Sequence, residues 1–471
     1  MKHLASSGVR AHVVVLLGAA ALPLSGAAAR GLTAATISFP SPFAACRSNG
    51  GNAFENAEVE PSIAVAPGDR RVIVVYQQDR FPDAAARGIA GSVSDDGGGT
   101  WRRTLIPVGA CAGGLGPART SDPWVSVGPD GRAYALASST AVTSTDGGRT
   151  WTNPHTLATT TASFLPDKAS ISAHPTRRGV AYAVWSRYHL RKTGPPVQGD
   201  SMFVRTHDGG RTWTTPRVIL RHGADSGPIA SVILADPRRR RLYHFTFWQV
   251  GVVPTLKRPS RLVVQSSSDG GSTWSAPRRI SRALTVGVSR DPTSGREIRG
   301  GAVVPSFAVD RSSGAVYAVW QDSRFASKRV DQIVVAISRD GGKTWTSPQL
   351  VSRRGRQAFV PTVAVTPAGV VGIAYFEAPR GRSRLQRPIQ YELAVSRDRG
   401  RTFHRRAVGR AFGLADAPLL SGIPALAVPP GLFLGDYMGI DASDGRFHLA
   451  FVTANRSTSN RTDVRYASIS P

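Results

Sequence analysis

The chain has 471 residues and a formal net charge of +28, with 59 Lys and Arg against 31 Asp and Glu. Only six of the basic residues are Lys, so the excess is arginine, which is spread along the chain without a nucleic-acid-binding motif. A strongly basic surface attracts polyanions in general. We therefore keep adhesion to a polyanion as an alternative but expect no specific nucleic-acid partner.

The N-terminal residues 1–29 have the pattern of a secretory signal peptide. Lys2, His3 and Arg10 give a positive start, and an apolar run and a small-residue cleavage site follow at residues 13–24 and 27–29. The run is too short to span a membrane, and no later stretch approaches the ~18 apolar residues that a transmembrane helix needs. We expect residues 30–471 to form a single domain that is secreted, monomeric and without a membrane span.

Six copies of one eight-residue motif organise this domain. Each reads Ser/Thr-x-Asp-x-Gly-x-Thr-Trp, with departures in the last copy at Arg399 and Phe403. In such a turn the carboxylate can accept hydrogen bonds from its own backbone amides, and glycine adopts positive φ without steric cost. Strand-like runs flank each copy, so we predict a hairpin turn between two outer strands. The central acids are Asp96, Asp146, Asp208, Asp269, Asp340 and Asp398.

The motif resembles the Asp-box, or bacterial neuraminidase (BNR) repeat, of the sialidase superfamily of β-propellers. The resemblance implies an all-β fold of radially arranged four-stranded sheets in which the boxes have a structural role. Six four-stranded units and three strands after the last box give 27 strands, and the segment near Ala35–Phe39 is the natural partner that completes the last sheet. We predict a seven-bladed β-propeller closed by this N-terminal strand. Six blades, the usual number in sialidases, is the alternative.

Cys46 and Cys111 are the only cysteines, and the seven-bladed arrangement puts them in equivalent loops of neighbouring units. In an exported protein an even pair favours a disulfide, with two unpaired thiols as the alternative. The ten His show no metal-ligand spacing, so we expect no metal site. No cofactor is expected; calcium bound at the acidic channel mouth is the alternative, which no EF-hand-like run supports.

Acidic residues, including Asp167, stand at the starts of the predicted inner strands, where propellers bind ligands. The candidate catalytic residues are Asp436, Tyr437, Asp122 and Glu60. Asp122 with Asp436 or Glu60 could act as acid and base, and their separation would decide the stereochemical outcome. The resemblance implies instead a tyrosine nucleophile, for which Tyr437 is the best candidate. The arginine motif that the family has at the first inner strand is replaced here by Glu60-Pro61-Ser62.

Arginines recur a few residues after the second strand of several units. Guanidinium groups bind carboxylates and sulfates bidentately, so these side chains are candidates for binding an anionic substrate. Ion pairs between blades are the alternative, because the arginines recur in nearly every unit. The residues are Arg80, Arg187, Arg324, Arg380 and Arg456.

Two functions fit these observations. The first is a secreted, sialidase-like propeller that acts on or binds a glycan or another anionic extracellular polymer at the channel mouth, for example as an exo-acting glycoside hydrolase. The second is a non-catalytic extracellular recognition or scaffold propeller. The missing arginine motif favours the second, and the acidic residues at the strand starts favour the first.

Overall fold

The chain divides into two units, residues 1–30 and 31–471, and only the second is described below. The predicted signal peptide lies, apart from Met1, outside the described residues. In the part of the chain that is described, no helix is long and apolar enough to cross a membrane. The computed structural model describes residues 1, 32–46, 52–83, 85–114, 117–190, 197–251, 256, 257, 259–287, 289–291, 294–378, 388–422, 430–443, 445–455 and 461–471.

The second unit is an all-β structure, as predicted. We number its main sheets 1 to 7 in chain order. Sheet 1 consists of β2 (Phe54–Val65), β3 (Val72–Arg80), β4 (Ala86–Ser94) and β5 (Arg102–Ile106). Sheet 2 consists of β6 (Trp124–Val127), β7 (Ala133–Ala137), β8 (Thr140–Ser144) and β9 (Thr152–Thr156). Sheet 3 consists of β10 (Phe164–Ala173), β11 (Ala181–His189), β12 (Val197–Thr206) and β13 (Arg217–Leu220).

Sheets 4 to 6 repeat the same order of four antiparallel strands. Sheet 4 consists of β14 (Ser226–Asp236), β15 (Arg241–Val250), β16 (Ser260–Ser267) and β17 (Arg278–Ala283). Sheet 5 consists of β20 (Ser306–Val309), β21 (Val316–Asp322), β22 (Gln332–Ser338) and β23 (Gln349–Leu350). Sheet 6 consists of β24 (Gln357–Val365), β25 (Val371–Ala378), β26 (Ile389–Ser396) and β27 (His404–Phe412).

Sheet 7 combines the two ends of the unit. The short N-terminal strand pairs antiparallel with the last strand, Ala35 opposite Tyr466, so the predicted pairing is present. A parallel bridge between Ala57 and Thr462 also joins sheet 7 to sheet 1. The strands of sheet 7 are β30 (Gly439–Ser443), β31 (Arg446–Ala454), β32 (Thr462–Ile469) and β1 (Ala35–Thr36).

A small additional sheet was not predicted. Its strands have two or three residues each, and they come from two regions far apart in the sequence. Three short 3-10 helices complete the regular structure of the described residues, at Ala110–Ala112, Arg324–Ala326 and Leu414–Asp416. The strands of the small sheet are β18 (Ser289–Arg290), β19 (Glu297–Arg299), β28 (Leu419–Leu420) and β29 (Gly431–Phe433).

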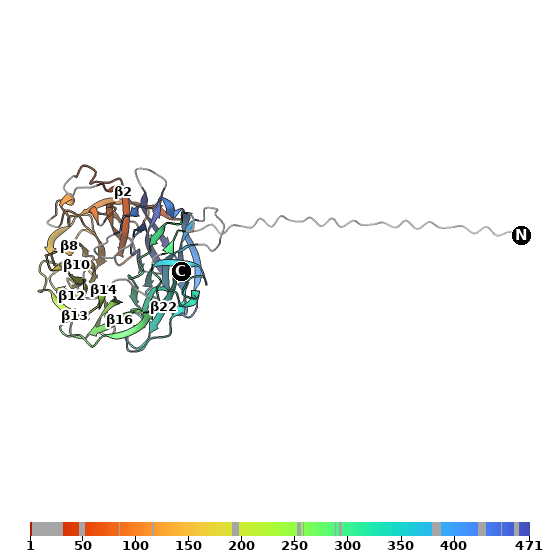
Figure 1. Ribbon diagram of the computed structural model, residues 1–471. Helices are drawn as coiled ribbons and strands as arrows, with labels where there is room; N and C mark the ends of the chain where they lie inside the picture. Colours follow the sequence, from red (N-terminus) through yellow and green to blue (C-terminus); the bar gives the residue numbers. More distant parts are fainter. Residues whose placement is uncertain are drawn as a thin grey trace. The chain divides into compact units, whose positions relative to one another are not determined.

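Each sheet packs face to face on the next one, and Figure 1 shows the sheets following one another in sequence order. The middle strands are therefore covered on both faces: β3 and β22 are buried at every position. Stacked rings join sheets 4 and 5 (Phe245 and Phe307, centroids 4.5 Å apart). The last sheet packs on the first, because Tyr466 shares a buried apolar cluster with Val74 and Tyr76.

The six motifs form hairpin turns between the third and fourth strands of sheets 1 to 6, as predicted. In the fourth copy Ser267 Oγ donates to Asp269 Oδ1 (2.7 Å), and the backbone N–H of Thr273 donates to the same oxygen (2.9 Å). The tryptophan of the motif packs against the preceding sheet, for example Trp274 on Phe203 of β12, with centroids 5.6 Å apart. Each turn therefore fastens its own sheet to the one before it.

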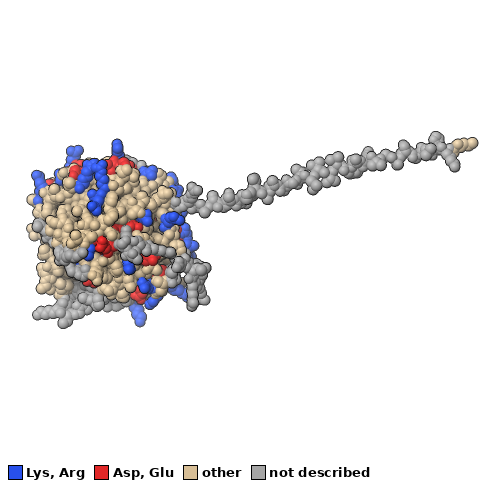
Figure 2. All heavy atoms as spheres, turned by 90° about the horizontal axis from the view of Figure 1, so that it is seen from above, with Lys and Arg blue, Asp and Glu red and all other residues tan. Residues whose placement is uncertain are grey.

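The predicted disulfide between Cys46 and Cys111 is present. It links the segment that follows β1 to the 3-10 helix after β5. On the surface, Figure 2 shows Lys and Arg spread over the visible face with other residues between them. This agrees with the even distribution of arginine along the sequence.

Candidate functional site

Polar side chains of three sheets lie at strained backbone positions in or just before the innermost strand. Glu60, Asp122 and Lys168 have φ values of 55°, 53° and 49°, which non-glycine residues rarely adopt. The strand register shifts at this point in β2 and β10. Ala230 and Val360 have the same backbone conformation in β14 and β24. The strained position is thus a repeated feature, and among the described residues its side chain is charged in sheets 1, 2 and 3. Bulges and strained residues of this kind concentrate at functional sites.

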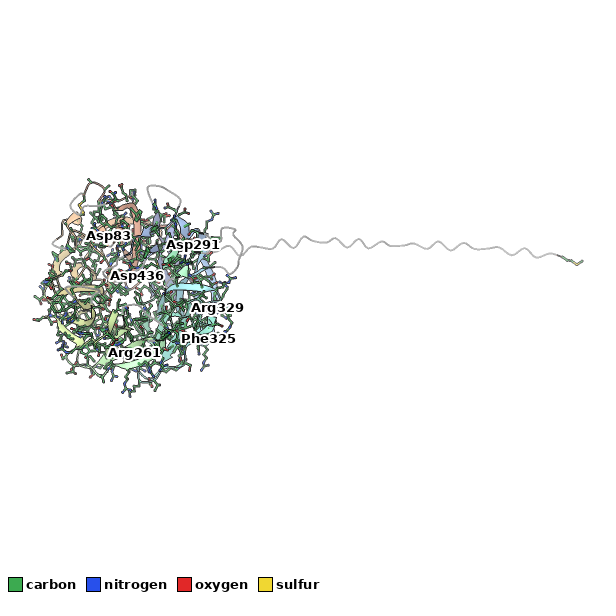
Figure 3. The ribbon with its side chains drawn as sticks, in the orientation of Figure 1. Asp83, Arg261, Asp291, Phe325, Arg329 and Asp436 are labelled. Carbon is green, nitrogen blue, oxygen red and sulfur yellow. A yellow bond between two sulfur atoms is a disulfide. The ribbon has the colours of Figure 1, made fainter. Side chains whose placement is uncertain are left out.

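Lys168 lies between carboxylates from three other parts of the chain. Its Nζ is 2.8 Å from Asp122 Oδ1, 2.8 Å from Asp436 Oδ2 and 3.5 Å from Glu60 Oε1. Its side chain is 11% exposed. We call the group formed by Glu60, Asp122, Asp167, Lys168, Arg299 and Asp436 the Lys168 cluster. Figure 3 shows Asp436 toward the middle of the second unit, with Arg261 and Arg329 nearer its margin.

Arg299 of the small sheet provides the second cation of the cluster. Its Nη2 and Nε lie 2.7 and 3.3 Å from the two carboxylate oxygens of Asp436. The backbone N–H of Asp436 donates to Glu60 Oε1 (3.1 Å), and Gln77 Nε2 donates to Glu60 Oε2. The small sheet, which the sequence did not predict, therefore closes one side of the site.

The Lys168 cluster shifts the pKa values of neighbouring carboxyl groups in opposite directions. Burial acts to raise the pKa of Asp122, but the charge and hydrogen bond of Lys168 outweigh it, so the pKa lies below its ordinary value. Burial and the negative charge of Asp122 raise the pKa of Asp167 to about 7. Burial opposes ionisation of Asp436, yet Arg299 and Lys168 hold its pKa low. Near neutral pH, Asp122 is therefore ionised and Asp167 is partly protonated, becoming fully protonated as the pH falls below 7.

Two cavities meet at this cluster. One, of about 660 Å³, is lined by the inner strands β2, β6, β10, β14, β20, β24 and β30. The other, of about 450 Å³, lies between sheets 2 and 3 and is lined in part by Thr140, Asp167 and Arg119. Asp122 and Lys168 line both cavities. Volumes of this size suit a sugar-sized ligand.

Tyr437 lies beside the cluster with its hydroxyl already engaged. The hydroxyl donates to the carbonyl oxygen of Pro123 (2.9 Å). Burial, together with the nearby carboxylates of Glu60 and Asp122, raises its pKa well above the ordinary value. In this arrangement the phenol is held as a neutral hydrogen-bond donor.

The predicted arginines lie in different places. Arg80 is buried near the cluster, where burial lowers its pKa to about 10, and donates to the carbonyl of Ala85. Arg187 pairs with Asp200 (2.9 Å), and Arg324 pairs bidentately with Asp322 (2.8 Å for both bonds). Arg187 and Arg324 thus pair with a carboxylate of their own sheet. Arg380 and Arg456 lie outside the described residues.

Glu60, Asp122, Asp436 and Tyr437 are brought together from sheets 1, 2 and 7, as their places at strand starts suggested. Lys168 and Arg299 complete the site and were not singled out in the sequence. Lys168 follows Asp167 at the same strand start, which is a signal that could have identified it. Arg299 lies in a three-residue strand and gives no comparable signal.

Sequence comparison relates the chain to the family already suggested by the turns. Residues 198–409 match the BNR repeat-like domain family. A protein described as a sialidase from Bacteroides fragilis (strain YCH46) is 26% identical over 246 residues, which cover 48% of this chain and 41% of the relative. The match thus spans about two fifths of that relative's length. These matches support assignment of the chain to the sialidase/BNR-repeat superfamily.

Solved structures that match the chain share little sequence with it. A protein of unknown function from Dyadobacter fermentans DSM 18053 has a TM-score of 0.46 at 14% identity, covering 93% of this chain and 98% of that one. An ulvan lyase has a TM-score of 0.49 at 11% identity, covering 88% and 94%. The Hadza microbial sialidase Hz136 has a TM-score of 0.44 at 14% identity, covering 88% and 66%.

Proposed function

We propose that the chain is a secreted, sialidase-like glycoside hydrolase, built as a closed seven-bladed β-propeller, that cleaves glycans at the Lys168 cluster. The observation that carries the proposal is the Asp122–Asp167 pair beside a cavity of about 450 Å³, in which the pKa of Asp122 is lowered and the pKa of Asp167 is raised to about 7. Carboxyl groups with pKa values pushed apart are what glycoside hydrolysis requires.

The packing of the sheets supports a closed ring. Apolar clusters join each sheet to the next, and the one that contains Tyr76, Ala450 and Tyr466 joins sheet 7 to sheet 1. Polar bonds join inner strands in the same order: the N–H of Val125 donates to Ser62 Oγ (3.1 Å), and the N–H of Val65 donates to Asp441 Oδ2 (2.8 Å). Export fits the disulfide, because disulfides persist in oxidising compartments.

In the proposed reaction Asp167 is the general acid. Its proton passes to the glycosidic oxygen as the bond from that oxygen to the sugar breaks, while ionised Asp122 stabilises the positive charge that develops on the sugar ring. A water molecule then attacks the sugar, and the Asp167 carboxylate takes up one of its protons, which restores the starting state. Lys168 and Arg299 keep Asp122 and Asp436 ionised. Tyr437 has a positioning role, because its hydroxyl holds the backbone directly after Asp122.

A non-catalytic recognition propeller is the second candidate. It is favoured by the pairing of Lys168 with Asp122 and Asp436, which compensates the buried charges without a ligand. In that case the cluster stabilises the inner strands, and the cavities bind a glycan without cleaving it.

Turnover of fluorogenic glycosides, including a sialoside, and of a panel of polysaccharides tests the proposal. We expect Asp167→Asn and Asp122→Asn each to reduce kcat by about 10²–10⁴-fold, the usual contribution of acid–base catalysis. Asp331→Asn is the matched control: Asp331 is a buried carboxyl group in sheet 5 whose pKa is likewise raised to about 7 by burial. Equal turnover by wild type, Asp167→Asn and Asp122→Asn would refute the assignment, and glycan binding without turnover would favour the recognition function.

A further inference from the structure

Three potential metal ligands meet at one end of sheet 3. His189 is the last residue of β11, Asp200 lies in β12, and His222 follows β13. His222 Nδ1 is 2.8 Å from Asp200 Oδ1, and His189 Nε2 is 3.3 Å from Asp200 Oδ2. One ligand atom from each of the three residues lies within 4.8 Å of the others. The spacings of 11 and 22 residues match no short metal-binding motif, which is why the sequence predicted no metal site.

Hydrogen bonds hold the carboxylate of Asp200 in place without a bound ion. The side chain of Asp200 is 2% exposed. Arg187 Nη2 donates to Oδ2 (2.9 Å), and the backbone N–H of His222 donates to Oδ1 (3.1 Å). Arg187 is itself held over the ring of Phe164, 4.6 Å from its centroid. Metal-ligating carboxylates are commonly oriented by outer hydrogen bonds of this kind.

We propose that His189, Asp200 and His222 form a binding site for a divalent transition-metal ion of the Zn²⁺ class. Two imidazole nitrogens and one carboxylate oxygen are a donor set that suits Zn²⁺ and disfavours Ca²⁺ and Mg²⁺, which prefer oxygen ligands. In a tetrahedral site with metal–ligand bonds of ~2.0–2.2 Å, donor atoms lie roughly 3.3 Å apart. His222 and His189 lie 2.8 and 3.3 Å from different oxygens of Asp200. One ligand atom from each of the three residues lies within 4.8 Å of the others, so small side-chain rotations bring the three donors to the tetrahedral separation.

Binding of the ion replaces hydrogen bonds with coordinate bonds. Each ring nitrogen that faces Asp200 loses its hydrogen, which either shifts to the other nitrogen of the ring or is released to solvent, so that a lone pair points at the ion. The two histidine side chains are 32% and 29% exposed. The fourth coordination position therefore faces solvent, where water or an anionic group of a ligand can occupy it.

The site lies next to the Lys168 cluster but does not depend on the proposed hydrolase activity. In the register of β10 and β11, Phe164 is opposite His189 and Asp167 is opposite Ser186. Three residues along a strand separate Phe164 from Asp167, a distance of roughly 10 Å. An ion held here ties together β11, β12 and the segment after β13. Of these, β11 pairs with β10, whose residues 165–169 line the smaller cavity.

Metal binding by the purified full-length chain, first treated with a chelator, tests the proposal. We expect calorimetric titration with Zn²⁺ to give one ion per chain and Co²⁺ to give the visible absorption of a tetrahedral complex. His222→Ala and Asp200→Asn should each weaken binding by at least tenfold. Equimolar Ca²⁺ should not displace Co²⁺.

The control variant is His404→Ala, which removes an exposed histidine of sheet 6 and should bind Zn²⁺ as the wild type does. The melting temperature and circular dichroism of each metal-free variant show whether it folds. Absence of saturable binding would overturn the proposal, and so would wild-type affinity in folded His222→Ala and Asp200→Asn. The three residues would then form only a hydrogen-bonded ion cluster.

Discussion

In each turn, the glycine two residues after the central aspartate lies close to the preceding sheet. Gly271 has φ +89°, and a Cβ atom placed on it would overlap the ring of Phe203, which is buried. We expect Gly271→Ala to lower the free energy of unfolding by about 1–2 kcal/mol through the left-handed backbone and by about 1–3 kcal/mol more through overpacking. Chemical denaturation with guanidinium measures the sum.

Gly342 occupies the same position of the next motif and provides the control. Its φ is +82°, but a Cβ atom there would meet Tyr243 and Val264 only at 3.8 Å, an ordinary contact. Gly342→Ala should therefore show the backbone effect alone. Equal losses in the two variants would mean that the contact with the preceding sheet contributes nothing to stability.

At the residue scale, the sequence indicated four of the six residues of the Lys168 cluster. Glu60, Asp122, Asp167 and Asp436 could be identified because each stands at a repeated position, near the predicted start of an inner strand. Lys168 stands there too, but a single lysine at a strand start has no chemical signature of its own. Its importance comes from three carboxylates that only the packing of sheets 1, 2, 3 and 7 brings within 3.5 Å of its Nζ.

At the element scale, the disulfide joins two connecting segments. Cys46 and Cys111 are 65 residues apart, so the bond closes a long loop in the unfolded chain. We expect the double variant Cys46→Ser/Cys111→Ser to lose about 2–4 kcal/mol of stability. Thermal unfolding measured with and without reductant checks this. Reductant should lower the melting temperature of the wild type and leave that of the double variant unchanged; an effect on both would point to another cause.

Regular strands were predictable and short ones were not. The strands of sheets 1 to 6 carry β-branched and aromatic residues between Gly and Asp turns, and six turns of one kind fix their order. The small sheet has no such pattern. Its strand β19 pairs with β29, which lies more than 130 residues further along the chain. Backbone pairing of three-residue segments depends on their surroundings, so Arg299 could not be placed from sequence.

At the scale of the whole molecule, one carboxyl group links stability to the proposed activity. The pKa of Asp167 is about 7 in the folded chain, against about 3.9 for an unperturbed aspartate. Its contribution to stability is therefore fully present below pH ~4 and is lost as the pH rises through 7. The folded chain should therefore lose stability between about pH 4 and pH 7, on the order of 1.4 kcal/mol for each pH unit. Asp167→Asn should lose less over the same range, as measured by guanidinium denaturation.

Asp331 distinguishes a group that affects only stability from a group that also transfers a proton. Its pKa is also about 7 through burial, so Asp331→Asn should flatten the stability profile in the same pH range. Asp331 lies in sheet 5, hydrogen-bonded to Thr285 and Val286, and outside the Lys168 cluster. Wild type and Asp331→Asn should therefore both lose turnover as the pH rises above 7, because the general acid becomes deprotonated. Any residual turnover of Asp167→Asn should lack this decline. If the decline persists in Asp167→Asn, or if it disappears in Asp331→Asn, the proton donor is another residue.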